Sequence, residues 1–140
     1  MILVDTGPLV AAALNGDAHH IKCVELFTAA HLNSESLLVP SLVVTEVCYL
    51  LERESGPRLE ADFLRSAAAG DFQLVETIPA DLNRAADLVI TYADFPLGAV
   101  DATLIAQAER LAITEIATLD RRHFAAVRPR HVDTFTIHPD

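Results

Sequence analysis

The first residues of the chain constrain its fold more than any other stretch. The run Ile2 to Val4 is apolar and partly β-branched, which is typical of a short strand buried in a parallel sheet. It ends at Asp5, after which Thr6 offers an N-cap hydroxyl and Pro8 suits the first turn of a helix. We therefore expect Asp5 at the carboxyl end of a central strand, where ligands bind in open α/β sheets.

Strand and helix patterns alternate along the rest of the chain. Further strands are predicted at residues 37–39, 72–77, 113–117 and 134–137. Helices are predicted at residues 9–14, 19–31, 42–54, 58–69, 80–93, 99–111 and 121–124, with Ser41 capping the third of them. We expect residues 1–140 to form one α/β domain, in which helices cover both faces of a mainly parallel sheet of about five strands.

The composition favours a folded globular protein over a disordered chain or a membrane protein. Hydrophobic residues make up 51% of the 140 positions, which argues against disorder. No apolar run approaches the roughly 18–20 residues that span a bilayer, and the first residues lack the features of a signal peptide. We therefore expect a soluble, cytoplasmic protein. Cys23 and Cys48 have no CxxC spacing, so they are expected to be free thiols in a reducing compartment.

The charges are unevenly distributed. A net charge of −10 is unusual for a protein that holds nucleic acid by broad electrostatic attraction. The excess of acids indicates either that no phosphate-bearing substrate binds or that acids are gathered around divalent cations. In contrast, the segment 121–131 holds no acid and four of the 10 Lys and Arg residues, namely Arg121, Arg122, Arg128 and Arg130.

Two acids lie on largely apolar faces of predicted helices. Glu46 and Asp101 both have mostly apolar neighbours three and four positions away. Burying a carboxylate costs several kcal/mol unless the group is paired or binds a metal. Arg53 is an alternative partner for Glu46, while Asp101 is also suited to the first turn of its helix. Asp120 follows an apolar strand, as Asp5 does, and is also a candidate N-cap.

These acids are more informative together than singly. Asp5 and Asp120 end strands at the same edge of the predicted sheet, and Glu46 and Asp101 face inward from helices that lead away from that edge. Four crowded carboxylates would raise one another's pKa. Mg²⁺ or Mn²⁺ with oxygen ligands relieves such repulsion and suits phosphoryl chemistry.

Four motifs carry a family resemblance that extends over essentially the whole chain. They are Val4-Asp5-Thr6, Ser41-x4-Glu46, the segment Leu97 to Ala102, and the segment Thr118 to Phe124, which is the most specific. In these motifs the chain resembles PIN-domain ribonucleases, and among them the VapC-type toxins of bacterial toxin–antitoxin pairs. One departure is Gly7-Pro8, which replaces the small polar residue more common after Asp-Thr.

The resemblance implies a three-layer α/β/α sandwich with metal-dependent endoribonuclease activity. It implies that Asp5, Glu46, Asp101 and Asp120 form the catalytic Mg²⁺ or Mn²⁺ site, whether for one cation or two. Thr118 and Thr6 would support this site, with Asp94 as an outer-sphere helper. The RNA backbone would be held by Arg121, Arg122, Arg128 and Arg130.

The resemblance also implies partners. A cognate VapB-type antitoxin would wrap the toxin and block its site, and DNA binding would belong to the antitoxin. We further expect a homodimer, because a small chain so rich in apolar residues is expected to expose apolar surface. The helices between Leu42 and Ala69 are the candidate contact surfaces for these partners. No membrane association is expected.

Other classes of function fit the sequence less well. A catalytically silent PIN-like binding module would have signalled itself by the loss of one of the four acids, and none is missing. A phospho-accepting receiver domain needs a lysine near its site, and the only lysine is Lys22 in an early helix. A haloacid-dehalogenase-type phosphatase needs a second aspartate two positions after the first, where this chain has Gly7.

Overall fold

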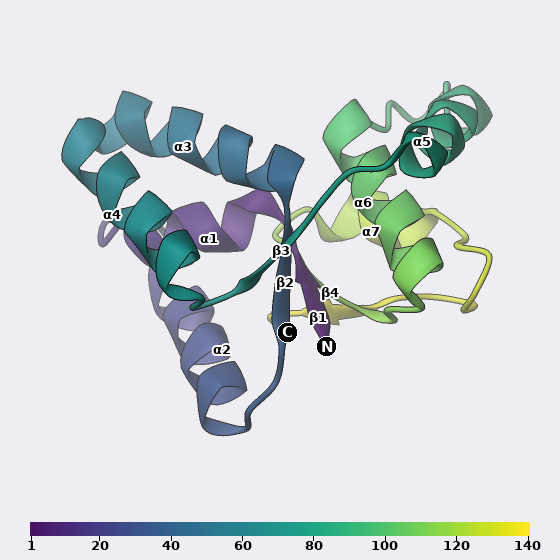
Figure 1. Ribbon diagram of the computed structural model, residues 1–140. Coiled ribbons are helices and arrows are strands. Elements are labelled where there is room, and N and C mark those ends of the chain that lie inside the picture. Colours follow the sequence, from purple (N-terminus) through teal and green to yellow (C-terminus); the bar gives the residue numbers. More distant parts are fainter.

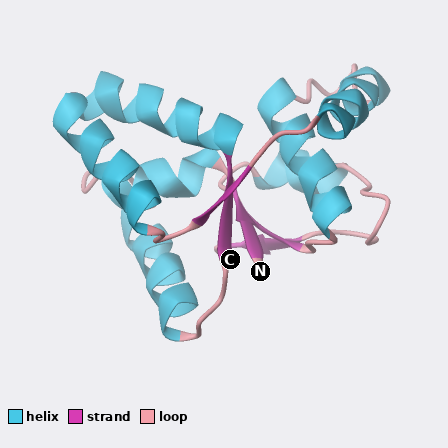
Figure 2. Ribbon diagram, in the orientation of Figure 1, coloured by secondary structure: helices cyan, strands magenta, loops and turns pink.

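The computed structural model describes residues 1–140, and helices alternate with strands along the whole chain (Figures 1 and 2). The elements are β1 (Ile2–Val4), α1 (Thr6–Ala13), α2 (His20–Leu32), β2 (Leu37–Pro40), α3 (Ser41–Ser55), α4 (Pro57–Ala69), β3 (Gln73–Val75), α5 (Pro79–Thr91), α6 (Ala99–Leu111), β4 (Glu115–Ala117), α7 (Arg121–Ala126) and β5 (Thr136–His138). None of these helices is long and apolar enough to cross a membrane.

The strands form one five-stranded sheet in the order β3-β2-β1-β4-β5. Every neighbouring pair is parallel, which confirms the predicted α/β class. Helices α1 to α4 lie on one side of the sheet and α5 to α7 on the other (Figure 1). This division follows from right-handed crossovers, because the chain first winds from β1 outward to β3 and then returns across the sheet to β4.

The register of the sheet sets which residues meet at its carboxyl edge. Val4 of the central strand β1 lies opposite Ala117 of β4, so Asp5 and Thr118 leave the sheet side by side. The amide of Asp5 extends this pairing by donating to the carbonyl of Ala117 at 2.8 Å. The acids expected after β1 and β4 therefore lie at the same carboxyl edge of the sheet.

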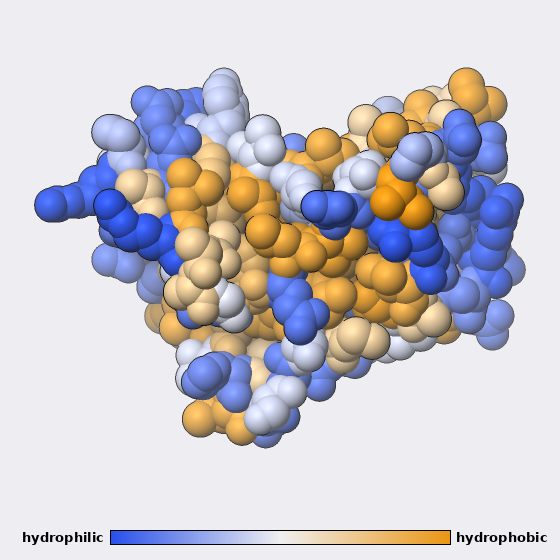
Figure 3. All heavy atoms as spheres, viewed as in Figure 1, coloured by the Kyte–Doolittle hydropathy of each residue, from blue (hydrophilic) through white to orange (hydrophobic).

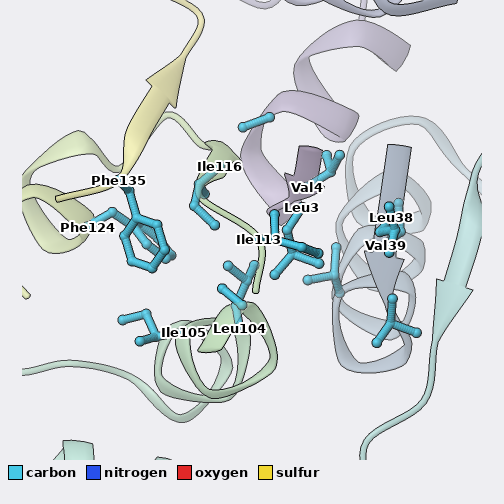
Figure 4. Packing of buried hydrophobic residues seen from close by; sticks show 14 of the residues in the cluster. Leu3, Val4, Leu38, Val39, Leu104, Ile105, Ile113, Ile116, Phe124 and Phe135 are labelled. Atoms are coloured by element: carbon cyan, nitrogen blue, oxygen red, sulfur yellow. The ribbon is translucent and has the colours of Figure 1, made fainter. Parts of the chain in front are cut away.

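The core on both faces of the sheet is built from aliphatic and aromatic side chains. Leu3 and Val4 of the central strand are fully buried, as the apolar run predicted. On the side of α6 and α7 they are joined by Leu104 and by Phe124, which packs against the ring of Phe135 at a centroid distance of 6.4 Å (Figure 4). A core of this kind holds the short strands rigidly and so fixes the loops that follow them.

The two expected helix caps differ from those in the structure. Thr6 is not an N-cap but the first residue of α1, and the cap is Asp5, whose side chain accepts a hydrogen bond from the Thr6 amide. Ser41 is likewise the first residue of α3, after the cap residue Pro40, and its hydroxyl donates to the carbonyl of Val75 on β3. Helix α7 extends to Ala126 rather than ending at Phe124.

Candidate active site at the carboxyl edge of the sheet

A cavity of about 640 Å³ opens at the carboxyl edge of the central strands, between α3 and the start of α6. Its lining residues are Asp5, Thr6, Gly7, Glu46, Leu50, Gly98, Ala99, Val100, Asp101, Leu119 and Asp120. All four acids predicted from the sequence line this cavity, which we call the acidic pocket. No lysine or arginine is among its lining residues, so the charges of the four carboxylates are not balanced within it.

Asp5 is the most firmly held of the four acids. Only 7% of the residue is exposed, and one carboxylate oxygen accepts the Thr6 amide at 2.8 Å while the other accepts the Thr118 hydroxyl at 2.7 Å. Burial raises the pKa of Asp5, the two hydrogen bonds oppose the rise, and the charges of Glu46 and Asp120 add to it. The Asp5 carboxylate is thus fixed in direction at the floor of the pocket.

The Thr118 hydroxyl joins the ends of the two central strands. While donating to Asp5, it accepts a hydrogen bond from the backbone amide of Asp120 at 3.0 Å. Asp120 in turn caps α7 by accepting the His123 amide, as the capping interpretation predicted. The loop after β4 is thereby shaped around one buried hydroxyl.

Asp101, Asp120 and His123 form a compact cluster at one wall of the acidic pocket. His123 Nδ1 lies 3.1 Å from Asp101 Oδ2 and 2.6 Å from Asp120 Oδ2. One donor atom from each of the three residues falls within 4.8 Å of the others. Burial, and then the charge of Asp5, raises the pKa of Asp101 from 3.8 to about 6, although the hydrogen bond with His123 opposes the rise.

His123 was not predicted as a site residue from the sequence. Its place on α7, three positions after Asp120, puts both side chains on the same face of the helix. That spacing was the signal available in the sequence. The ring of Phe95 stands perpendicular to the His123 ring at a centroid distance of 5.1 Å, which restricts its orientation.

Glu46 and Thr6 complete the pocket with groups that have no structural partner in the protein. Glu46 is half-buried on α3, and the alternative ion pair with Arg53 does not form, because Arg53 pairs with Glu54 instead. Thr6 is only 4% exposed, yet its hydroxyl oxygen makes no hydrogen bond. A buried, unpartnered oxygen beside several carboxylates is suited to a bound ligand that brings water or positive charge.

The donor set of the acidic pocket fits a divalent cation. It combines carboxylate oxygens from four chain segments, an imidazole nitrogen and the unpartnered Thr6 hydroxyl. Hard cations such as Mg²⁺ and Mn²⁺ are bound through oxygen ligands of this kind and keep positions open for water or substrate.

The remaining residues predicted for the site lie outside the pocket. Asp94 is exposed in the turn after α5 and does not line it. Arg121 is tied to the end of the chain, donating to the carbonyls of Ile137 and Pro139. The Arg122 guanidinium lies 5.2 Å from the centre of the Phe95 ring, next to the cluster.

Arg128 and Arg130 are exposed beyond the end of α7. Only their backbone amides make hydrogen bonds, to the Tyr92 hydroxyl and to the Glu109 carboxylate. Arg122, Arg128 and Arg130 therefore present their charges to solvent, whereas Arg121 is engaged in packing the end of the chain.

A second cavity, of about 620 Å³, lies on the face of the sheet covered by α1, α2 and α4. Aromatic and aliphatic side chains dominate its wall, including Phe27, Phe63 and Phe72, while His31, Glu35, Asp62 and Asp71 also line it. We call it the apolar cavity. It contains none of the four acids of the acidic pocket, so the two cavities are suited to different kinds of ligand.

The sequence of this chain matches a known protein family and a relative of similar length. The PIN domain family matches residues 2–128. Ribonuclease VapC26 of Mycobacterium tuberculosis is 33% identical over 138 residues, which cover 99% of this chain and 100% of the relative.

Solved structures share the fold at lower sequence identity. The sarcin-ricin loop cleaving toxin VapC20 of Mycobacterium tuberculosis has a TM-score of 0.83 at 21% identity, covering 95% of this chain and 99% of that one. A toxin–antitoxin complex from Klebsiella pneumoniae has a TM-score of 0.65 at 19% identity, covering 94% and 100%.

Proposed function

This chain belongs to the PIN-domain family, within its VapC type, and on that premise we propose that it is a metal-dependent endoribonuclease toxin. The observation that carries the proposal is the acidic pocket, where four carboxylates meet at the carboxyl edge of a parallel sheet without a lysine or arginine to balance them. An RNA phosphodiester bond would be hydrolysed at this pocket.

Asp5, Asp101 and Asp120 would hold the cation, with Glu46 as a further ligand either directly or through water. A bound Mg²⁺ or Mn²⁺ supplies orientation of the scissile phosphate, a lower pKa for the attacking water and stabilisation of the leaving oxygen. The orientation of the Asp5 carboxylate is fixed, because hydrogen bonds from Thr6 and Thr118 hold both of its oxygens. The Thr118 hydroxyl also accepts the backbone amide of Asp120 and so holds Asp120 near Asp5.

Glu46 is the acid best placed to accept the proton of the attacking water. Its carboxylate lines the pocket from α3, opposite the wall formed by Asp101 and Asp120, and Arg53 does not neutralise it. A general base must lie within hydrogen-bond reach of the water and remain unpaired. Asp5 is less suited, because both of its oxygens already accept hydrogen bonds.

The substrate proposed for this pocket is single-stranded or loop RNA. A small concave site needs phosphates that a regular duplex does not expose. The exposed Arg122, Arg128 and Arg130 would attract the backbone on the side of α7, in spite of the net charge of −10. We place the reaction in the cytoplasm, where such RNA is found.

RNA cleavage by purified protein tests the proposal. We expect the wild type to cleave an end-labelled single-stranded RNA pool with Mg²⁺ or Mn²⁺ but not with EDTA. Asp5→Asn should slow cleavage by about a hundredfold or more, the loss typical of removing a group that acts at the reacting atoms. Asp133→Asn, which changes an exposed acid outside the pocket, is the matched control and should cleave normally.

Two outcomes would contradict the proposal. If Asp5→Asn cleaved as fast as the wild type, the acidic pocket would not be the catalytic centre. If the folded wild type cleaved no RNA with either cation, the chain would be a silent PIN-like module that acts only by binding its partner.

A VapB-type antitoxin is the proposed protein partner, and DNA would be bound only through it. The apolar cavity supports this proposal, because its aromatic wall is suited to an apolar segment of another chain, while Asp62 and Asp71 favour basic residues beside that segment. One of the solved structures with this fold is itself a toxin–antitoxin complex.

We also propose a homodimer. Helices α3 and α4 expose Leu42, Tyr49 and Leu64, and the edge strand β3 exposes Leu74. Apolar side chains gather over the middle of the face shown in Figure 3. Light scattering should therefore give a mass about twice the chain mass of 15.2 kDa, whereas a monomer at all concentrations would contradict this assembly.

A further inference from the structure

The cluster of Asp101, Asp120 and His123 contains one group that an all-carboxylate site would not need. We infer that His123 Nδ1 is itself a ligand of the cation, so that the site binds Mn²⁺ in preference to Mg²⁺. This inference rests on the proposed function, since it concerns the cation of the same pocket. It adds a nitrogen donor to a site otherwise made of oxygens.

Two distances within the cluster are close to the edge of a coordination octahedron. With ligands at about 2.1 Å from a cation, neighbouring donor atoms of an octahedron lie about 3.0 Å apart. His123 Nδ1 lies 3.1 Å from the Asp101 oxygen and 2.6 Å from the Asp120 oxygen. The Asp101 and Asp120 oxygens lie within 4.8 Å of each other, so a cation that contacts all three atoms would need adjustment of side chains alone.

The His123 ring is held where it is, rather than free to turn away. Its residue lies on the first turn of α7, whose cap is Asp120. The Phe95 ring stands perpendicular to it at 5.1 Å, and Phe124, the next residue along the helix, is fully buried in the core. The nitrogen is thereby held against Asp101 and Asp120, both of which line the acidic pocket.

The rest of the pocket is compatible with a cation bound at His123 Nδ1. Neither oxygen of Asp5 needs to move, because its hydrogen bonds come from Thr6 and Thr118. The unpartnered Thr6 hydroxyl lies in the same pocket, a second sign that a ligand belongs there.

An imidazole ligand changes which cation is favoured. Mg²⁺ prefers oxygen ligands and gives up its water reluctantly, whereas imidazole nitrogen suits the transition metals. Mn²⁺ also accepts carboxylate ligands, so it matches a mixed set of carboxylates and one imidazole. His123 would therefore act as a residue that determines cation specificity.

Pulsed electron paramagnetic resonance of the Mn²⁺-loaded protein tests the inference without a substrate. Tag-free wild type should show modulation from a directly bound ¹⁴N nucleus, which changes to the ¹⁵N pattern when histidine is ¹⁵N-labelled. His123→Ala should lose this signal. His19→Ala, which removes an exposed histidine far from the pocket, should keep it.

Calorimetric titration of the same proteins gives a second readout. We expect His123→Ala to weaken Mn²⁺ binding about tenfold or more and Mg²⁺ binding by a smaller factor, so that the preference for Mn²⁺ shrinks. His19→Ala should leave both affinities unchanged.

The outcomes separate this inference from the function on which it rests. Wild type that binds Mn²⁺ without nitrogen coupling would overturn the role of His123 while leaving the carboxylate site intact. Equal losses of Mn²⁺ and Mg²⁺ affinity in His123→Ala would also overturn the claimed specificity. Wild type that binds neither cation would overturn both the inference and the proposed metal site.

Discussion

At the scale of single residues, the acids of the pocket differ in how they are stabilised. Asp5 is buried and accepts two hydrogen bonds, whereas Asp101 relies on His123 alone and lies close to the charges of Asp5 and Asp120. A carboxylate with one partner and two like-charged neighbours destabilises the folded state when ionised. The protein therefore keeps a site whose charges favour cation binding over stability.

The raised pKa of Asp101 predicts how stability depends on pH in the absence of metal. Between its ordinary value of 3.8 and the folded value of about 6, the folded state binds more protons than the unfolded state, so stability falls as pH rises through this window. We expect Asp101→Asn with EDTA to be more stable than the wild type at pH 7, on the order of 1 kcal/mol after solvent screening.

Urea unfolding at pH 4 and pH 7 measures this effect. The gain of Asp101→Asn over the wild type should shrink at the lower pH, where the wild-type carboxyl is largely protonated. An equal difference at both values would show that the ionisation of Asp101 does not matter to stability.

At the scale of elements, a partly buried ion pair joins the start of α5 to the end of α6. Asp81 is 1% exposed and accepts both the Nε and Nη2 groups of Arg110, at 2.8 and 3.0 Å, as well as the Ile78 amide. Burial raises the pKa of Asp81, but the hydrogen bonds from Arg110, Ile78 and Gln107 outweigh it and lower the pKa below its ordinary value. This pair fixes α6, which carries Asp101.

We predict that Asp81→Asn destabilises the fold by about 1–3 kcal/mol, because it weakens the bonds of a buried network. The contribution of Asp81 is present above its unfolded pKa of about 3.8 and is lost as pH falls through its lower folded pKa. Denaturant unfolding at pH 7 gives the first result and an acid titration the second. Asp87→Asn on the exposed face of α5 is the control, and an equally small effect of both substitutions would contradict the prediction.

Much of the element structure could be predicted from the sequence, because short apolar runs and helical periodicity reflect burial directly. The strand predicted at 134–137 begins later, at Thr136, since Phe135 packs into the core before the pairing with β4 starts. Thr6 and Ser41 were wrongly predicted as caps. The residues that precede them are the caps, because the register of the sheet sets where each helix begins. This register cannot be read from the local sequence.

The site was predictable only in part for the same reason. The four acids could be found because each one departs from an apolar pattern. The His123 contacts and the Asp81–Arg110 pair depend on how α7 and the α5–α6 pair are packed, which no local pattern records. The tie between Arg121 and the last residues likewise arises from the tertiary fold alone.

At the scale of the whole molecule, the fold separates the acidic pocket, where we propose catalysis, from the apolar cavity, where we propose partner binding. The acidic pocket lies at the carboxyl edge of the sheet, between helices from its two sides, and the apolar cavity lies on the face covered by α1, α2 and α4. Both contact the segment after β1, since Asp5 lines one and Leu9 the other. A partner in the apolar cavity would therefore lie within one short helix of the acidic pocket.

This arrangement predicts that antitoxin binding and RNA cleavage can be changed independently. Ala12→Arg would place a long charged side chain in the wall of the apolar cavity, so we expect weaker co-purification with the cognate antitoxin and unchanged RNA cleavage. Ile21→Arg, at an exposed position of α2 outside both cavities, is the matched control. Normal antitoxin binding by the folded Ala12→Arg protein would exclude the cavity as the docking site.

The most direct test of the central claim is the thermal unfolding of wild type and Asp5→Asn with EDTA, Mg²⁺ or Mn²⁺. A cation that binds only the folded state stabilises it, by about 2.7 kcal/mol at a hundred times its Kd. We predict that cations raise the unfolding temperature of the wild type but not of Asp5→Asn, and that with EDTA the variant is at least as stable as the wild type. If no cation shifted the wild type and Asp5→Asn unfolded at a lower temperature, the acids would be structural and the pocket would not be a metal centre.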